Sequence, residues 1–509
     1  MSKRKSRPKP TRLPPSRSPA EGSGQLPTII GWGAASIAIV LAVVLRFWAS
    51  LDNFWLDEIW SWMMAGQLNS PLEIVTRLHH DNNHHLNTFV LYSFGKDAPV
   101  YLYRLPAVLA GIGAVLLCGW VARRWSRPAA VAATLLTGCS FLLIQYSSEA
   151  RGYAYLLFFT MASFAVIQES LERPGAIWQM LFACCAILGF LSHLTYLFAY
   201  VALVAWSLWH RIRRDGWLSR RHIVPFICQV LIPGSFVVLL YFVDLRYIQV
   251  GGGDENSVWS VIAQATSAAF GGPLEGSATV WITVAVALVA IAALFLLYRA
   301  GSDLWVPMGV GIFVFPAVIL LIARPQWPYP RYFLVSMLFL QLLISWFFGW
   351  LYQRPNGKIV YVIVLVAILG GNAILTTRFL TYGRGGYEAA VHYMLDQTFS
   401  EQVFVASDHD FRNKTVLAFY FARAKDGDRA RYYEFGKWPS EGPEWILFHA
   451  FTQKYSPEKF VRDDQGHTYE LARVFPYAGL SGFHWALYHN TNRPTNAPLE
   501  ADPQGPSAR

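Results

Sequence analysis

Charged residues are scarce in this chain. Only 15% of its 509 residues are Asp, Glu, Lys or Arg, whereas soluble domains carry about 25%. The scarcity is uneven, because apolar stretches of about 20 residues, the length that crosses a bilayer as a helix, recur along the chain. A backbone in lipid must satisfy its own hydrogen bonds, so these stretches are predicted to be helices. The composition excludes a soluble globular protein and predicts an α-helical multi-pass membrane protein.

Cysteine is also rare, and none follows residue 228. All five cysteines fall within the apolar stretches, so no disulfide framework is predicted and small packing residues are expected instead. Phosphate-binding glycine motifs are missing too. The run Gly251-Gly252-Gly253 lacks the flanking strand and helix of a phosphate loop and predicts a flexible outer loop.

The apolar stretches predict about eleven transmembrane helices and three further regions. A disordered basic cytoplasmic tail covers 1–27, a soluble α/β domain covers 379–490, and a flexible tail covers 491–509. Between them, 28–378 forms the membrane domain, with outer loops at 51–98 and 244–276. The predicted spans lie near 28–50, 99–122, 129–147, 153–171, 176–192, 194–210, 223–243, 277–298, 304–323, 332–352 and 358–378.

Basic residues set the predicted orientation. They gather in the N-terminal tail and in alternate loops, near 123–127, 173, 211–221, 299 and 354–358. Basic loops stay on the cytoplasmic side, so the N-terminus is predicted to be cytoplasmic. With an odd number of spans, the C-terminal domain is then extracytoplasmic. The net charge of +10 comes mostly from these flanks, so it indicates topology and not a nucleic-acid partner.

The region after residue 379 alternates strand-like and helix-like patterns. Strands are predicted at 402–406, 431–435 and 445–449, and a helix at 415–423. Two more predicted strands, 468–475 and 484–489, are expected to pair. These patterns predict a small α/β domain.

Two adjacent acids, Asp57 and Glu58, follow the first apolar span. Acids at a membrane surface are costly unless they have a partner or a task. A histidine-rich segment with His84 and His85 comes next, and Arg104-Leu105-Pro106 opens the second span. The alternative is that the acids are solvated residues of an interfacial aromatic belt. The neighbouring segment favours an active site.

Further along, Glu149-Ala150-Arg151-Gly152-Tyr153 and Pro330-Arg331-Tyr332 lie at predicted outer helix ends. Together with the acidic pair, the His-Leu segment and Arg-Leu-Pro, they resemble the GT-C class of membrane glycosyltransferases. That class includes the protein O-mannosyltransferases and the aminoarabinose transferases that modify lipid A. The family's H-P-P-L segment is His84-His85-Leu86-Asn87 here, without the prolines. The resemblance covers the membrane domain and not the soluble domain.

The resemblance implies an enzyme that takes a sugar from a polyprenyl-phosphate donor and passes it to an acceptor hydroxyl. The hydroxyl must lose a proton, and a carboxylate can take it. We expect Asp57 to be that base, with Glu58 orienting Asp57 or holding the acceptor. The acceptor, a protein, lipid or glycan, stays open. The predicted substrate-binding residues are His84, His85, Arg104, Glu149, Arg151, Tyr153, Arg331 and Tyr332.

Arg151 and Arg331 are the expected partners of the lipid phosphate, because the guanidinium fork matches phosphate geometry. The alternative is that they are long cations that merely snorkel to the interface. Arg104 is expected to orient the loop through an ion pair. No cofactor is assigned. The histidines fall short of a tetrahedral metal set, and a divalent cation near this loop stays open only because some members of the class bind one.

Two other functions compete with the glycosyltransferase. A transporter or flippase of lipid-linked sugars would need charged or broken helices near the bilayer midplane, and span centres here hold almost no ionisable residues. A non-enzymatic membrane scaffold with an outer binding domain would leave Asp57 dispensable. The breadth of the family favours a bacterial inner (plasma) membrane.

Overall fold

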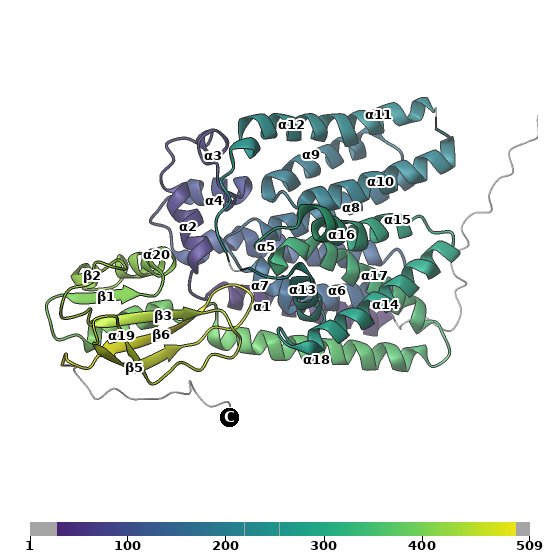
Figure 1. Cartoon of the computed structure of the whole chain (residues 1–509). Helices are drawn as coiled ribbons and strands as arrows, with labels where there is room; N and C mark the ends of the chain where they lie inside the picture. The colour runs from purple at the N-terminus through teal and green to yellow at the C-terminus, as the bar shows by residue number, and fades with distance from the viewer. Residues whose placement is uncertain (1–27, 218, 254, 495–509) are drawn as a thin grey trace, which may run out of the picture.

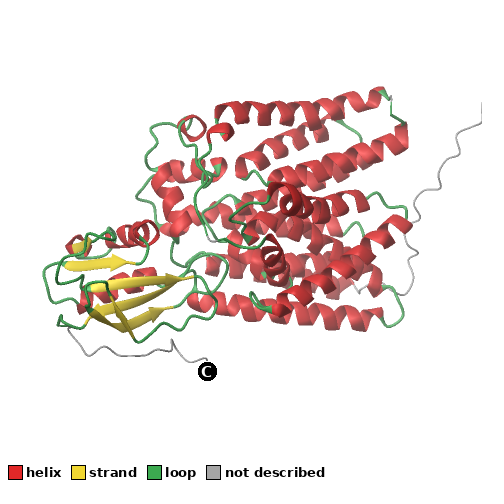
Figure 2. Cartoon of the chain, in the orientation of Figure 1, coloured by secondary structure: helices red, strands yellow, loops and turns green. Residues whose placement is uncertain are grey.

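The chain forms a bundle of long helices with a sheet domain at one end (Figure 1, Figure 2). The computed structural model describes residues 28–217, 219–253 and 255–494. The predicted disordered tail, 1–27, and residues 495–509 of the predicted flexible tail lie outside the described residues.

Helices occupy all eleven predicted span positions. Two of these positions consist of short α-helices joined by π-helical turns. The elements are α1 (Thr28–Ala49), α5 (Val100–Ala122), α6 (Arg127–Gly138) with α7 (Phe141–Ser147), α8 (Tyr153–Glu172), α9 (Ala176–Ser192), α10 (Tyr196–Asp215), α11 (Ile223–Phe226) with α12 (Ile232–Val243), α14 (Ser277–Arg299), α15 (Trp305–Gly309) with α16 (Phe315–Val318), α17 (Leu334–Tyr352) and α18 (Gly357–Tyr382).

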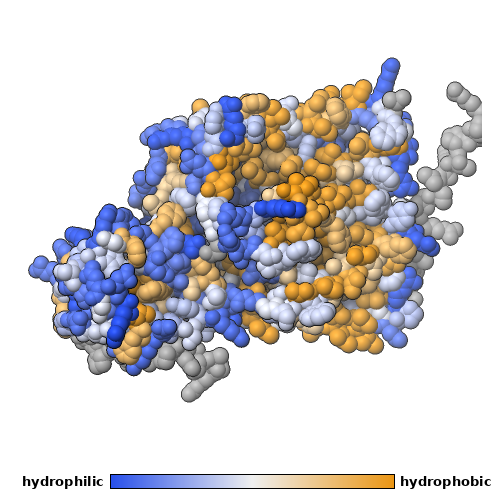
Figure 3. Space-filling model, viewed as in Figure 1, coloured by the Kyte–Doolittle hydropathy of each residue, from blue (hydrophilic) through white to orange (hydrophobic). Residues whose placement is uncertain are grey.

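Fewer of these helices meet the length and hydropathy of a membrane span. Within the described residues, seven segments do so, or eight if α6 and α7, bent by 57°, form one span. The apolar parts of α1 and α9 are shorter, Gly33–Ala49 and Ala176–Ser192. The count of about eleven is therefore not confirmed. A mostly helical membrane protein is confirmed, and Figure 3 shows hydrophobic residues over the middle of the bundle.

The bundle core lies between α5, α6, α8 and α17. Phe164 of α8 and Phe339 of α17 are fully buried there, with ring centroids 6.1 Å apart. By contrast, α14 and α18 leave large apolar side chains such as Phe295 and Ile363 exposed. Burial of apolar area drives the core together, while the exposed apolar faces suit contact with lipid tails.

Both predicted outer loops contain helices. The first, between α1 and α5, folds into α2 (Leu56–Ala65), α3 (Glu73–Thr76) and α4 (His85–Phe94). The second contains α13 (Val258–Ala269). These short helices fix the backbone around the acids and histidines that the sequence singles out.

The sheet domain has six strands in the order β2-β1-β3-β6-β5-β4. β1 is parallel to β2 and β3, and β6 is antiparallel to β3 and β5. The predicted pairing of 468–475 with 484–489 is confirmed, whereas β4 and α19 were not predicted. The elements are α19 (Tyr387–Gln397), β1 (Val403–Ser407), α20 (Asp410–Phe421), β2 (Ala430–Tyr432), β3 (Trp445–Ala450), β4 (Phe460–Arg462), β5 (Thr468–Phe475) and β6 (His484–Asn490).

The core of the sheet domain continues into the outer end of the bundle. Phe54, just before α2, stacks on Phe419 of α20 with ring centroids 6.0 Å apart. Tyr420 donates a hydrogen bond of 2.9 Å to the carbonyl oxygen of Phe54. The sheet domain therefore packs against the same short helix that carries Asp57 and Glu58.

Candidate active site

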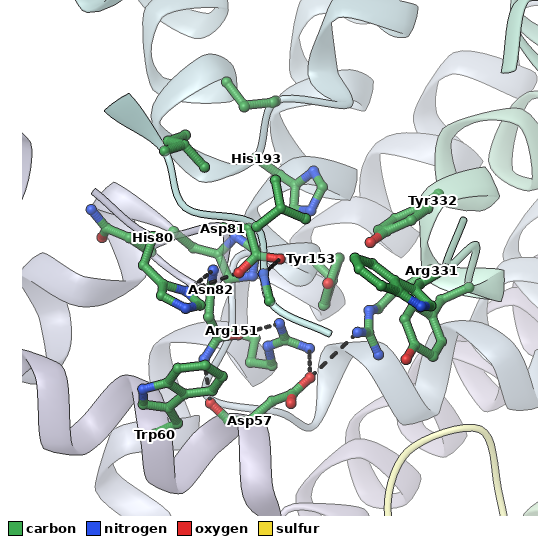
Figure 4. Close-up of a pocket in the computed structure, with 18 of the residues that line it drawn as sticks. Asp57, Trp60, His80, Asp81, Asn82, Arg151, Tyr153, His193, Arg331 and Tyr332 are labelled. Atoms are coloured by element: carbon green, nitrogen blue, oxygen red, sulfur yellow. Dashed lines mark hydrogen bonds and ion pairs between the residues drawn. The ribbon is translucent and has the colours of Figure 1, made fainter. Parts of the chain in front are cut away.

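A cavity of about 450 Å³ lies at the end of the bundle nearest the sheet domain. Its walls come from α2, the segment before α4, the start of α8, the end of α9 and the loops at 248–252 and 325–332. Figure 4 shows side chains from these separate elements converging on it. Of the predicted site residues, the cavity is lined by Asp57, His84, His85, Arg151, Tyr153, Arg331 and Tyr332.

Asp57 faces two arginines across the floor of the cavity. Its Oδ2 lies 2.7 Å from Nη1 of Arg151 and 3.5 Å from Nη2 of Arg331. Asp57 stands in the first turn of α2, and 17% of its side chain is exposed. Asp57 therefore lies within ion-pair distance of both guanidinium groups and is reachable from the cavity.

Asn82, which was not predicted as a site residue, closes a ring with Asp57 and Arg151. Its Oδ1 accepts a hydrogen bond of 2.5 Å from Arg151, and its Nδ2 donates one of 2.9 Å to the Asp57 carbonyl oxygen. Nδ2 also donates to Ser61 at 2.9 Å. Because these bonds fix both members of the ion pair, Asn82 orients them. A single amide in a polar segment gives no sequence signal for this role.

Both arginines lie against aromatic rings at the cavity. Arg151 is almost fully buried, yet its Nε has no hydrogen-bond partner. The guanidinium of Arg151 lies 5.0 Å from the ring of Tyr153, and that of Arg331 lies 4.0 Å from the ring of Tyr329. The two guanidinium groups thus bring two positive charges to the cavity beside the single carboxylate of Asp57.

His84 and His193 form a neutral wall opposite the arginines. Their rings stack with centroids 4.8 Å apart, and Nε2 of His84 is buried without a partner. Burial, followed by the charges of the neighbouring arginines, lowers the pKa of His193 to about 3 and holds the pKa of His84 well below its usual range. Both rings are therefore neutral at neutral pH.

The low pKa of His193 predicts that acid destabilises the folded protein. The unfolded chain protonates His193 near pH 6.5, whereas the folded chain keeps it neutral to about 3. Between pH 6.5 and pH 3 the unfolded state binds more protons than the folded state. The contribution of His193 to the free energy of unfolding is therefore complete above pH 6.5 and declines as the pH falls. At pH 5 we expect His193 to lower the free energy of unfolding by roughly 1–2 kcal/mol, before the reduction due to screening by solvent. Thermal unfolding in detergent at pH 7.5 and pH 5 measures it.

His193→Gln is expected to shrink the acid-induced drop in melting temperature. His392, exposed on α19, gives the matched control, because His392→Gln leaves the drop unchanged. Equal drops in wild type and His193→Gln contradict the assignment.

His85 is tied to the end of α12. Its Nε2 lies 2.6 Å from Oδ2 of Asp244, and Nδ1 of His79 lies 2.7 Å from the other carboxylate oxygen. Asp244 is only 1% exposed, and the sequence analysis did not single it out. In the part of the chain that the structure describes, no group of three His, Cys, Asp or Glu side chains is arranged to hold a metal. The two histidines instead anchor the loop at 79–85 to α12.

Glu58 and Arg104 do not line the cavity. They form an ion pair in which both side chains are fully buried, with Arg104 Nε 2.8 Å from Oε1 and Nη2 2.5 Å from Oε2. Oε1 also accepts a hydrogen bond of 2.7 Å from the backbone N–H of Ala150. The pair fixes the residues next to Asp57 and Arg151. The ion pair expected for Arg104 is thus present, with Glu58 as its partner. Contact of either side chain with substrate stays a prediction.

Glu149 also points away from the cavity. Its side chain is fully buried, and Oε1 lies 3.4 Å from Nε of Arg384, which stands two residues after the end of α18. Arg384 also lies 3.3 Å from Asp52 and donates to Ser148 Oγ at 2.9 Å. Glu149 thus joins the bundle to the sheet domain and does not line the cavity.

The fold has known counterparts. No protein-family model and no curated protein sequence matches the chain. Among solved structures, ArnT from Cupriavidus metallidurans in the apo state has a TM-score of 0.52 and 14% identity, covering 83% of this chain and 93% of that chain. ArnT bound to undecaprenyl phosphate has a TM-score of 0.50 and 13% identity, covering 94% and 100%.

A third structure, the archaeal oligosaccharyltransferase AglB from Archaeoglobus fulgidus in complex with an inhibitory peptide and a dolichol-phosphate, has a TM-score of 0.47 and 11% identity, covering 82% and 69%. At the identities of the ArnT structures, the likeness establishes the fold. The chain therefore has a GT-C-like fold, as its motifs predict.

Proposed function

We propose that this protein is a glycosyltransferase that moves a sugar from a polyprenyl-phosphate donor to an acceptor hydroxyl, with Asp57 as the general base. One observation carries the proposal: a carboxylate and two arginines, both within 3.5 Å of it, meet in one cavity at the end of a membrane bundle. The solved ArnT structure with undecaprenyl phosphate supports the choice of donor.

The reaction follows from this geometry. The acceptor oxygen bonds to the anomeric carbon of the donor as its proton passes to Asp57. The bond between that carbon and the phosphate oxygen breaks, and its electron pair leaves with the lipid phosphate. Arg151 and Arg331 stabilise the charge that grows on the leaving oxygen. Phosphate binding also draws both guanidinium groups from Asp57, which leaves its carboxylate free to accept the proton.

We place the cavity on the extracytoplasmic face of a bacterial inner membrane, with the N-terminus in the cytoplasm. Basic residues at the opposite end of the bundle support this orientation, and Figure 3 shows hydrophilic residues gathered at that end. Labelling of single cysteines tests it: position 57 reacts with an impermeant reagent from outside, and position 214 only after the cytoplasmic side is opened. The reverse pattern contradicts the orientation.

The proposed polyprenyl-phosphate donor predicts that replacing the guanidinium group of Arg331 weakens binding of the lipid phosphate. Arg331→Lys keeps the charge but loses bidentate bonding to phosphate. A hydrogen bond to a charged group contributes about 1.5–3 kcal/mol, so we expect undecaprenyl phosphate to bind about 10- to 100-fold more weakly. Binding is measured by native mass spectrometry of the purified protein.

The matched control for this measurement is Arg246→Lys. Arg246 also lies over an aromatic ring, 4.5 Å from that of Tyr247, but it does not line the cavity. Its replacement is expected to leave binding unchanged. Unaltered affinity in Arg331→Lys would remove Arg331 as a phosphate ligand.

The function itself is tested by supplying the donor. Membranes that contain the protein, with empty membranes as control, receive a polyprenyl-phosphate-linked sugar and a panel of protein, lipid and glycan acceptors. We expect release of polyprenyl phosphate together with one labelled acceptor. Movement of the intact donor across the bilayer without any release would favour the flippase instead.

A further inference from the structure

His193 lines the cavity but has no part in the reaction proposed above. It ends α9 in an extended backbone conformation, and its side chain belongs to the same cavity wall as Arg151 and Arg331. The proposed transfer uses the carboxylate of Asp57 and the two guanidinium groups. The imidazole of His193 therefore stands beside the reacting groups without an assigned task.

The short turn between α9 and α10 fixes the tautomer of His193. Its Nδ1 accepts a hydrogen bond of 3.1 Å from the backbone N–H of Thr195 and lies 2.8 Å from Oγ1 of the same residue. A ring nitrogen that accepts a hydrogen bond from an N–H carries no proton, so the single proton of the neutral ring is on Nε2. Burial and the neighbouring arginines, which lower the pKa of His193 to about 3, act in the same direction.

The Nε2–H group of His193 is a hydrogen-bond donor that the protein leaves unused. Both polar contacts of the ring are made at Nδ1, and none of the residues that the structure describes accepts from Nε2. The ring stacks on His84 and lies 5.0 Å from the ring of Tyr153. Figure 4 shows it pointing into the cavity. An oxygen atom of a bound ligand is therefore the acceptor that this donor fits.

The cavity changes from charged to apolar at His193. On one side the ring of Tyr153 separates His193 from Arg151, whose guanidinium lies 5.0 Å from that ring. On the other side Leu191 and Leu194 line the cavity, and Leu194 is 43% exposed on the surface of the bundle. In a polyprenyl phosphate, the phosphate joins the polar part to the hydrocarbon chain. The boundary between the arginines and the leucines is thus the place that suits the phosphate.

We propose that His193 is a ligand of the lipid phosphate, to which its Nε2–H donates a hydrogen bond beside the charges of Arg151 and Arg331. A neutral donor orients a phosphate oxygen without adding a third positive charge to the cavity. The inference rests on the proposed function, because it adds a residue to the site for the polyprenyl-phosphate donor. The same bond forms with a polyprenyl phosphate that carries no sugar, so binding of that lipid reports on it without any transfer.

Two substitutions separate the donor group from the ring. His193→Phe keeps an aromatic ring against His84 and Tyr153 but has no N–H. His193→Gln loses the ring and keeps an N–H donor near the position of Nε2. Binding of undecaprenyl phosphate to the full-length protein in detergent is measured by native mass spectrometry. We expect His193→Phe to bind about 10-fold more weakly, the loss of one hydrogen bond to a charged group, and His193→Gln to keep most of the affinity.

His409→Phe is the matched control for the loss of a histidine. Nδ1 of His409 also accepts a backbone N–H, from Arg412 at 3.3 Å, but His409 precedes α20 in the sheet domain and does not line the cavity. Its replacement is expected to leave binding unchanged. The melting temperature of each variant shows whether it is folded. If His193→Phe does not fold, His193→Ala, which also lacks the donor and adds no bulk, takes its place.

Arg331→Lys, measured in parallel, distinguishes a failure of this inference from a failure of the proposed function. Weaker binding in Arg331→Lys with full affinity in His193→Phe would overturn the role of His193 and leave the phosphate site in place. Full affinity in both variants would remove the phosphate site itself. Equal losses in His193→Phe and His193→Gln would show that the ring, and not its N–H, holds the lipid. Full affinity in His193→Phe with slower sugar transfer would place the hydrogen bond on the sugar or the acceptor instead.

Discussion

Asp57→Asn protein is expected to insert and fold normally but to lose sugar transfer by about 10²- to 10⁴-fold, the usual contribution of a general base. Asparagine keeps the size of the side chain and its place at the start of α2, but it cannot take the acceptor's proton. The measurement is initial transfer from a polyprenyl-phosphate-linked sugar in membranes, normalised to the amount of folded protein.

The cavity provides a matched control for this variant. Asp81 also lines it, but its carboxylate is engaged by His80 at 2.8 Å and by the backbone N–H of Gly251 at 3.1 Å. Asp81→Asn therefore removes an acid from the same cavity without touching the proposed base, and we expect a far smaller loss. If Asp57→Asn kept full transfer, Asp57 would be only a counter-ion for Arg151 and Arg331.

A measurement of substrate binding distinguishes the loss of a general base from the loss of the folded site. Asp57→Asn also removes the negative charge between Arg151 and Arg331, which frees both guanidinium groups for phosphate. We expect the variant to bind undecaprenyl phosphate at least as tightly as the wild type while transfer is lost. Weaker binding would show that Asp57 holds the arginines in their working positions.

Arg104→Met is expected to cause the largest loss of stability, about 3–5 kcal/mol, because it leaves Glu58 charged, unpaired and buried. Arg104 also donates hydrogen bonds to the carbonyl oxygens of Ser50, at 3.0 Å, and Asn53, at 2.8 Å. Removing it therefore frees the chain between α1 and α2. The melting temperature in detergent, monitored by fluorescence-detected size-exclusion chromatography, measures this loss.

Two comparisons make the Arg104 result interpretable. Arg213→Met breaks an ion pair with Asp303 at the other end of the bundle, where the Arg213 side chain is 54% exposed, and we expect a loss below about 1 kcal/mol. The double variant Arg104→Met with Glu58→Gln removes both charges, so part of the stability should return. A single variant as stable as the wild type would contradict the buried-charge argument.

Short motifs indicated residues that meet in one cavity, whereas apolar runs did not settle the number of membrane spans. Asp57 and Arg151 are 94 residues apart in sequence, yet their motifs placed both at outer helix ends, where a shared topology brings them together. The number of membrane spans is harder to predict from sequence, because the length and hydropathy of a helix do not show which of its faces pack inside the protein. α10, for example, begins apolar and ends in the basic run at 210–214.

Sequence alone could not separate side chains that face the cavity from those that turn inward. Glu149 and Arg151 are two residues apart, yet only Arg151 lines the cavity. The partner that draws Glu149 inward, Arg384, lies 235 residues away in a glycine-rich segment that resembles a linker. Such a pairing depends on tertiary contacts, and no local pattern carries it.

Arg384 has a consequence for how this protein can be dissected. It is the first large side chain after α18 and is fully buried among Asp52, Glu149 and the carbonyl oxygen of Gln145. A truncation before it would leave the fully buried Glu149 without its partner in the interior of what remains. The C-terminal portion is thus not a detachable module, and any chimera that exchanges it must cross over after residue 384.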